Sequence, residues 1–239
     1  MQVDACHDDG TGDGGSEPSG GRKEGSAVRG QLYDPASMTW RCVDTRTADD
    51  RIESILAPLA PVGGSGPGDA LHAHGLSLRA WMPADLADFR ALLDDPQVWQ
   101  YLPEPYPDPF NDATARTLII AANTMPGSIV RAVLQAGRPI GQLRLQWLAD
   151  QPRREAEISY WLGRAHWGKG LGSTLVAGAM ARAFHNDPAL LRLTARVHPD
   201  NPASARLLQK AGFRELSAPP EGHEGSAWRW FALRRQHRP

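Results

Sequence analysis

Three glycines alternate with other residues in the run His166-Trp167-Gly168-Lys169-Gly170-Leu171-Gly172-Ser173. Apolar residues follow at helical spacing, which predicts a helix over residues 171–184. Backbone N–H groups at the start of a helix are unpaired and carry partial positive charge, so they bind anions, phosphates above all. Glycine removes the Cβ atoms that would keep a ligand away from these groups. The run therefore predicts a phosphate-binding loop.

The spacing of this loop excludes two common nucleotide-binding motifs. A Walker A loop needs Ser or Thr directly after its lysine, and Gly170 follows Lys169. A dinucleotide fingerprint needs Gly-x-Gly-x-x-Gly after a strand and an acidic residue for the ribose, and neither is present here. A glycine-rich connector that only makes a tight turn remains the alternative.

The elements that must position this loop alternate around it. Residues 153–162 and 191–197 have strand patterns, and residues 201–211 form a predicted helix that ends at Gly212. Further strands are predicted over 76–81, 128–135, 140–147, 213–216 and 226–233, and further helices over 83–93, from Asp95–Pro96, and over 111–123. A run of strands followed by alternation with helices predicts a mixed α/β sheet with a crossover beside the loop.

Two of these elements carry polar residues close to the loop in sequence. Glu157 shares one face of its predicted strand with Glu155 and Ser159. A strand carboxylate can act as a general base in a cleft, and a solvent-facing glutamate is the alternative. Asn201 opens the predicted helix 201–211, where capping the helix is its ordinary role.

The first 74 residues differ from the rest in composition. Residues 1–30 are rich in Gly, Ser, Asp and Glu and almost free of apolar residues, which predicts disorder. Residues 48–59 suit one short helix, and residues 63–68 have the composition of a linker. We therefore expect a mostly disordered extension and linker over 1–74, either dispensable or a docking segment, and a folded domain over 75–239.

Composition narrows the class of protein. The chain has 26 basic and 27 acidic residues, a balance that does not favour a DNA or membrane partner. No apolar run is long enough to cross a bilayer, and the acidic N-terminus does not resemble a signal peptide. Cys6 and Cys42 have no metal-binding or redox spacing. We expect a cytoplasmic protein without a metal.

Several of these stretches together resemble a known family. Trp167-Gly168-Lys169-Gly170-Leu171-Gly172 is similar to the acetyl-CoA loop of the GCN5-related N-acetyltransferases (GNAT), in the form common in the RimJ/RimL-like branch. The stretches 157–162, 197–204 and 208–213 resemble the fourth strand, the fifth strand with its turn, and the last helix of that branch. The resemblance covers about residues 76–233 and implies the GNAT acyl-CoA N-acyltransferase fold.

The resemblance implies an acetyl-CoA site. The residues expected to cradle the pyrophosphate are Gly168, Lys169, Gly170, Leu171, Gly172 and Ser173, next to Trp167. Backbone groups of Trp161 and Leu162 are expected to pair with the pantetheine arm like an added strand. Lys169 is expected to add positive charge near the phosphates, and the alternative is that it is an ordinary solvated surface lysine.

The resemblance also implies catalytic roles. Glu157 is the expected general base, and Asn201 is expected to contact either the CoA arm or its thioester end. Many relatives have a tyrosine acid seven residues after this asparagine, where this chain has Leu208. Ser204, Tyr160 or solvent must therefore protonate the leaving thiolate.

The acceptor that this reading implies is a primary amine. It is either a protein N-terminus, such as that of a ribosomal protein, or a small molecule such as an antibiotic or siderophore. A proline-rich loop and the helix after it carry three acidic residues that are candidates for attracting a cationic acceptor: Glu104, Asp108 and Asp112. A catalytically silent acyl-CoA-binding module is the alternative function. Either a monomer or a homodimer fits.

Overall fold

The computed structural model describes residues 29–34, 39–44, 71, 74–147, 154–220, 223 and 225–235. The predicted helix 48–59 and the linker 63–68 lie outside these ranges. So does the predicted disorder of residues 1–30, except for Arg29 and Gly30, which lie in a strand. The chain divides into two units, Met1–Thr47 and Ala48–Pro239. In the first unit, β1 (Arg29–Asp34) and β2 (Thr39–Asp44) pair as an antiparallel hairpin, which the sequence analysis did not predict.

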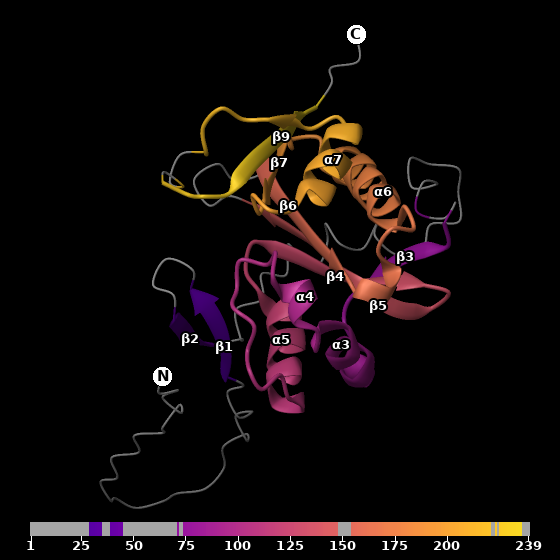
Figure 1. Ribbon diagram of the computed structural model, residues 1–239, viewed down its shortest axis with the longest axis vertical. Coiled ribbons are helices and arrows are strands. Elements are labelled where there is room, and N and C mark those ends of the chain that lie inside the picture. Colours follow the sequence, from indigo (N-terminus) through magenta and orange to yellow (C-terminus); the bar gives the residue numbers. More distant parts are fainter. Residues whose placement is uncertain are drawn as a thin grey trace, which may run out of the picture. The chain divides into compact units, whose positions relative to one another are not determined.

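A seven-stranded mixed sheet forms the second unit, in the order β3-β4-β5-β6-β7-β9-β8 (Figure 1). Its strands are β3 (Leu76–Arg79), β4 (Ser128–Gln135), β5 (Arg138–Trp147), β6 (Glu155–Leu162), β7 (Arg192–Val197), β8 (Arg214–Glu215) and β9 (Arg229–Arg234). All neighbouring strands are antiparallel except β6 and β7, which are parallel. The predicted mixed α/β sheet with a crossover after residue 162 is therefore confirmed.

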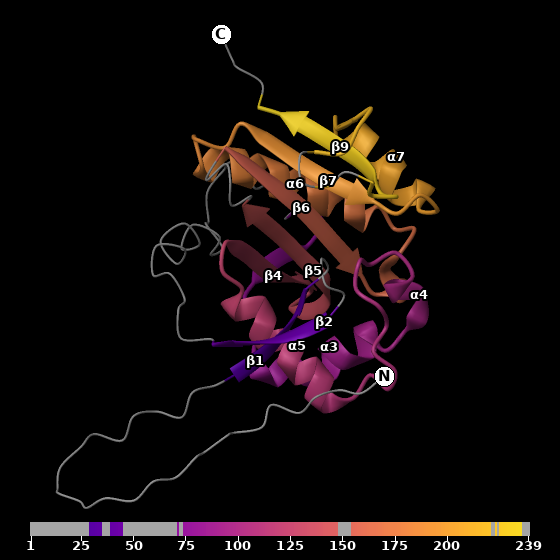
Figure 2. The same cartoon turned by 90° about the vertical axis from the view of Figure 1, so that its left-hand side faces the viewer.

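Helices cover both faces of this sheet (Figure 2). On one face lie α6 (Leu171–Asn186), which makes the crossover, and α7 (Pro202–Lys210). On the other face lie α3 (Leu86–Leu93), α4 (Pro96–Trp99) and α5 (Asp112–Thr124). Because side chains alternate along a strand, one strand can contribute to the hydrophobic core on both faces of the sheet. In β4, Ile129 packs toward α6 and Val130 packs toward α5.

The parallel pairing of β6 and β7 is short. The strands pair only through Glu155 with Arg192, Ala156 with Leu193 and Glu157 with Thr194. After Glu157 the two strands have no backbone pairing with each other. From there β6 pairs only with β5, and β7 pairs only with β9. We call this divergence the splay.

The core includes one residue upstream of the predicted domain boundary at 75. Leu71 is 1% exposed and belongs to the core beneath α6. A Cβ on Gly178 of α6 would lie 2.4 Å from Leu71 Cγ, so the glycine lets this leucine pack against the helix backbone. The folded unit therefore begins before residue 75.

Candidate active site

The glycine loop meets the N-terminus of α6 beside the splay. Gly168 and Gly170 have φ angles of 73° and 76°, a left-handed conformation that favours glycine. Gly170 is the N-cap of α6, so the first-turn N–H groups of Leu171, Gly172 and Ser173 have no partners within the helix. This arrangement fits the predicted anion cradle.

Gly172 has a different role from its two neighbours. A Cβ there would lie 2.8 Å from Leu207 Cδ1, so Gly172 allows α6 and α7 to approach closely. At Gly168 and Gly170 a Cβ would meet no atom within 4 Å. Gly168 and Gly170 are therefore explained by their left-handed backbone conformation, and Gly172 by the close packing of α6 and α7. Exposure of every amide to a ligand is not needed to explain the three alternating glycines.

Trp167 ties the loop to the end of β6. Its indole N–H donates a hydrogen bond to the carbonyl oxygen of Leu162 at 2.7 Å, while the side chain remains 41% exposed. Lys169 is exposed in the loop itself. Burial, and secondly the charge of Lys169, lowers the pKa of His166 below its usual value. The imidazole of His166 is therefore neutral at neutral pH. The positive charge of this loop is carried by Lys169.

The two strand residues expected to pair with the pantetheine arm point in different directions. Gly163 N–H donates to the Ile140 carbonyl at 2.9 Å, so this pair is hydrogen-bonded within the β5–β6 ladder. Because antiparallel pairs alternate, Trp161 also directs its backbone groups toward β5, whereas Leu162 and Tyr160 direct theirs toward the splay. The N–H group of Leu162 is therefore oriented for such pairing, whereas its carbonyl already accepts from Trp167 and Trp161 faces β5. Pairing with a pantetheine arm stays a prediction. The indole of Trp161 stacks on Trp81, at 6.4 Å between ring centroids.

Glu157 lies at the point where the splay opens and is 5% exposed. The alternative reading of a solvent-facing glutamate is therefore wrong. Its Oε1 atom lies 2.9 Å from Nε of Arg196 on β7. Arg196 was not among the predicted site residues. The available signal was the alternation of the strand, because Arg196 shares a face with Thr194, which pairs with Glu157.

Ser204 and Tyr160 form a hydroxyl pair on the other face of the sheet. Their oxygens are 3.0 Å apart, linking α7 to β6 across the splay. Burial raises the pKa of Tyr160, and the bond to Ser204 opposes this rise only in part. The phenol therefore keeps its proton at neutral pH. Leu208, in place of the usual tyrosine acid, is 1% exposed in the core.

Asn201 makes the bond expected of a helix cap. Its side-chain oxygen accepts a hydrogen bond from the Ser204 backbone N–H at 3.0 Å. Pro202 follows at the first position of α7. The cap fixes the first turn of α7 and with it the hydroxyl of Ser204.

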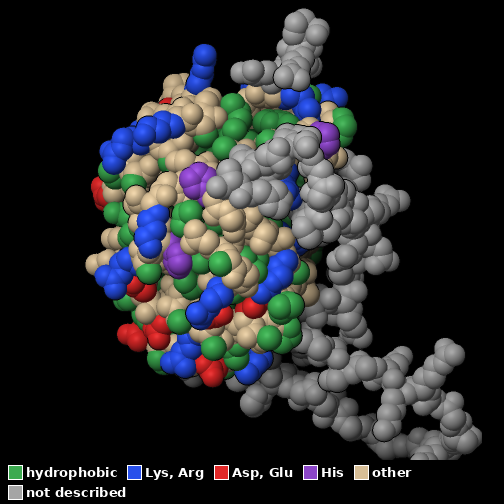
Figure 3. Space-filling view, turned by 90° about the vertical axis from the view of Figure 1, so that its right-hand side faces the viewer, with side chains coloured by type: hydrophobic (Ala, Val, Ile, Leu, Met, Phe, Trp, Pro, Cys, Tyr) green, Lys and Arg blue, Asp and Glu red, His purple; other side chains and the backbone are tan. Residues whose placement is uncertain are grey.

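The three acidic candidates for acceptor binding lie in different settings. Asp112, in the first turn of α5, pairs with Arg90 at 2.9 Å. Asp108 is exposed, and Glu104 is half-buried. Most acidic side chains on the face seen in Figure 3 lie in the lower part of the view, next to basic ones. The role of Glu104, Asp108 and Asp112 in binding an acceptor stays a prediction.

An aromatic cluster borders the splay. The ring of Tyr101, just after α4, lies 5.7 Å from that of His198 at the end of β7. His198 in turn packs edge-on against Trp228, at 5.4 Å. These contacts hold the start of the proline-rich loop, and so the segment leading to Glu104, against the end of β7. Neither His198 nor Trp228 was among the predicted site residues.

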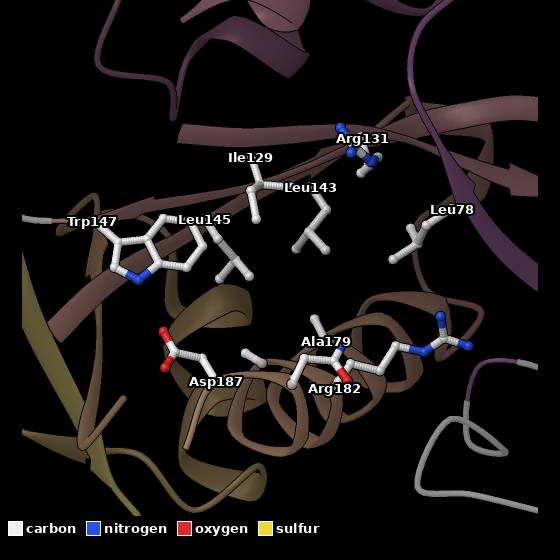
Figure 4. Close-up of a pocket in the computed structure, with 11 residues that line it drawn as sticks. Leu78, Ile129, Arg131, Leu143, Leu145, Trp147, Ala179, Arg182 and Asp187 are labelled. Atoms are coloured by element: carbon white, nitrogen blue, oxygen red, sulfur yellow. The ribbon is translucent and has the colours of Figure 1, made fainter. Parts of the chain in front are cut away.

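A separate groove lies between the sheet and α6 (Figure 4). Leu143 and Leu145 point from β5 toward Ala179, and Arg182 and Asp187 lie on the helix side. Leu145 pairs with Ile158, so the groove is on the face of the sheet opposite to Glu157. It is not part of the candidate active site.

Comparison with known proteins decides the family. The family model described as an acetyltransferase (GNAT) domain matches residues 76–214, more than half of the chain. The chain belongs to this family. It is an acetyltransferase, and the predicted GNAT fold is confirmed. A curated relative, the uncharacterized N-acetyltransferase p20 of Bacillus licheniformis, is 31% identical over 153 residues, which are 62% of this chain and 83% of the relative.

Solved structures share the fold at low sequence identity. RimJ of Mycobacterium smegmatis, in complex with CoA-disulfide, is 19% identical with a TM-score of 0.57, covering 66% of this chain and 81% of that one. Spermidine N-acetyltransferase of Vibrio cholerae, in complex with CoA and spermine, is 22% identical with a TM-score of 0.55, covering 67% and 95%.

Two further features are absent from the described residues. They contain no group of three or more His, Cys, Asp or Glu side chains able to hold a metal ion. None of the helices in the described ranges is long and apolar enough to span a membrane.

Proposed function

We propose that this chain transfers an acetyl group from acetyl-CoA to a primary amine by direct attack within a ternary complex. The observation that carries the proposal is the splay. This opening between β6 and β7 lies between the glycine loop at the start of α6 and the buried carboxylate of Glu157. The N–H group of Leu162 is directed toward it. A slim acyl-CoA arm fits such a gap as an added strand.

Glu157 acts as the base of the reaction. The neutral amine attacks the thioester carbonyl carbon, a C–N bond forms, and Glu157 accepts the proton lost by nitrogen, directly or through one water. The C–S bond then breaks and the CoA sulfur leaves as a thiolate. Holding amine and thioester together in the splay supplies much of the acceleration.

The hydroxyl pair of Tyr160 and Ser204 protonates the leaving sulfur. The raised pKa of Tyr160 keeps its proton available at neutral pH. Ser204 accepts from or donates to Tyr160 at 3.0 Å, so a proton given up by one hydroxyl can be replaced through the other. Leu208 then needs no catalytic role.

The acceptor approaches the face of the sheet that carries Glu157. Tyr101, His198 and Trp228 line this approach, and Glu104 follows three residues after Tyr101. An aromatic wall beside a carboxylate suits a cationic amine. Protein N-termini, as in a RimJ/RimL-like enzyme, and polyamines both meet this description.

A thiol-release assay tests the proposal. Acetyl-CoA is incubated with peptides bearing free N-termini, with spermine and with an aminoglycoside. We expect turnover of at least one amine, and a loss of kcat/KM of about 10²- to 10⁴-fold in Glu157→Gln. Glu155→Gln is the matched control, because Glu155 lies on the same face of β6 and also pairs with an arginine.

Two results would contradict the proposal. Tight CoA binding with no turnover of any amine would favour the silent acyl-CoA-binding module. Full activity of Glu157→Gln would remove Glu157 from the mechanism while leaving the acetyltransferase assignment in place.

A further inference from the structure

Two ion pairs link β6 and β7 on the face that carries Glu157. Arg192 pairs with Glu155, and Arg196 pairs with Glu157. They join the same strands on the same face with the same residue types. They differ in where they stand relative to the splay.

The Arg192 pair lies inside the paired part of the strands, where Arg192 is directly opposite Glu155. The residue opposite Glu157 is Thr194, not Arg196. Arg196 lies two residues further along, where β7 has already left β6. Its side chain therefore reaches back across the mouth of the splay to the carboxylate.

Burial and stacking restrict this arginine. The side chains of Arg196 and Glu157 are 19% and 6% exposed. The guanidinium carbon of Arg196 lies 5.9 Å from the ring centroid of Trp228, which packs in turn on His198. Arg196 is thus held between an aromatic ring and the carboxylate, with its Nε atom 2.9 Å from Oε1 of Glu157.

We propose that Arg196 is a positioning residue for the base, and that Trp228 holds Arg196 in place. With Oε1 fixed by Arg196, the other oxygen of Glu157 is aimed at the splay to receive the amine proton. Arg196 acts through Glu157 and does not contact the reacting atoms. This inference rests on the proposed function, since it assigns a partner to that base.

The test is a mutant cycle with an internal control. Arg196→Gln, Arg196→Lys, Glu157→Gln and the double variant Arg196→Gln/Glu157→Gln are compared with Arg192→Gln. For each variant, kcat and KM for the amine are measured, together with the Kd for CoA and the melting temperature. Arg192→Gln breaks an equivalent ion pair within the paired part of the strands, so it reports any purely structural cost.

We expect Arg196→Gln to lower kcat about 10- to 100-fold, the cost of misplacing a reacting group, with CoA binding unchanged. Arg192→Gln should change kcat less than about threefold. In the Glu157→Gln background, Arg196→Gln should cause less than about a twofold further loss, because its effect passes through Glu157. Arg196→Lys keeps a charge at the site and should restore part of kcat.

Three results would overturn the inference: equal losses from Arg196→Gln and Arg192→Gln, additive losses in the double variant, or full activity of Arg196→Gln. If Arg196→Gln does not fold, Arg196→Lys and Trp228→Phe are measured in its place. Wild-type kcat in both of these variants would overturn the inference. A wild-type enzyme that turns over no amine overturns the proposed function, and this inference with it. An active enzyme with an insensitive Arg196 overturns this inference alone.

Discussion

At the scale of single residues, the site gains its chemistry from contacts between distant parts of the chain. Tyr160 and Ser204 are 44 residues apart, yet their hydroxyl oxygens meet at 3.0 Å. Because burial raises the pKa of Tyr160, the phenol is a proton donor and not a base at neutral pH. A neutral donor suffices for a thiolate, which is already a good leaving group.

We predict that Tyr160→Phe lowers kcat about tenfold, less than a general acid usually contributes, because the leaving thiolate needs little help. Ser204→Ala should cost less, since the phenol remains. The ratio of wild-type to Tyr160→Phe kcat should be constant from about pH 6 to about pH 9, below the ordinary tyrosine pKa of about 10. CoA release measured across this range checks the prediction. A ratio that falls to one within it would mean that a different group donates the proton.

At the scale of elements, one carboxylate joins β3 to the start of α3. Asp85 ends the 3-10 helix Pro83–Asp85, accepts two hydrogen bonds from Arg79 at 2.6 and 2.8 Å, and accepts a third from the Met82 backbone N–H at 2.8 Å. The bonds from Arg79, more than that from Met82, lower the pKa of Asp85 below its usual value. This network fixes the helix that covers the acceptor face of the sheet.

We predict that Asp85→Asn lowers the free energy of unfolding by about 2–4 kcal/mol at pH 7, because Arg79 loses its buried partner. The folded-state pKa lies below the unfolded one, so the Asp85 contribution is complete above about pH 4 and is lost as pH falls through the folded pKa. The difference between wild type and variant should therefore shrink in acid. Urea unfolding at about pH 7, 5 and 3 measures it.

Asp88→Asn is the matched control, since Asp88 pairs with Arg138 at 3.3 Å on the surface. It should change stability by less than about 1 kcal/mol at each pH. A difference for Asp85→Asn that stays constant into acid would show that its cost is not electrostatic.

At the scale of the whole molecule, the transferase unit includes chain upstream of its first sheet strand. We predict that Leu71→Ala lowers the free energy of unfolding by about 2–5 kcal/mol, the usual cost of a cavity in a core. Leu191→Ala is the control, because Leu191 is 41% exposed. Urea unfolding of the full chain compares the two. Equal effects would mean that Leu71 is not part of the cooperative core.

The parts of the fold that were predicted correctly are those marked by local sequence signals. The start of α6 follows from Gly170 and the start of α7 from Asn201 and Pro202, and both helices begin within one residue of prediction. The hairpin β1–β2 was missed because strand pairing depends on a partner strand that no local pattern identifies. Arg196 was missed for the same reason: its importance comes from Glu157, placed beside it only by the crossover.

The splay has a consequence for how this protein avoids aggregation. Unpaired backbone groups at the edge of a sheet invite strands of other chains. Here β6 and β7 present such an edge in the interior of a sheet, where β5 and β9 occupy their outer sides. A foreign strand needs a long unpaired edge, and the part of β6 beyond its pairing with β7 is only residues 158–162. A short edge of this kind, flanked by β5 and β9, does not serve as a template for strand addition by another chain.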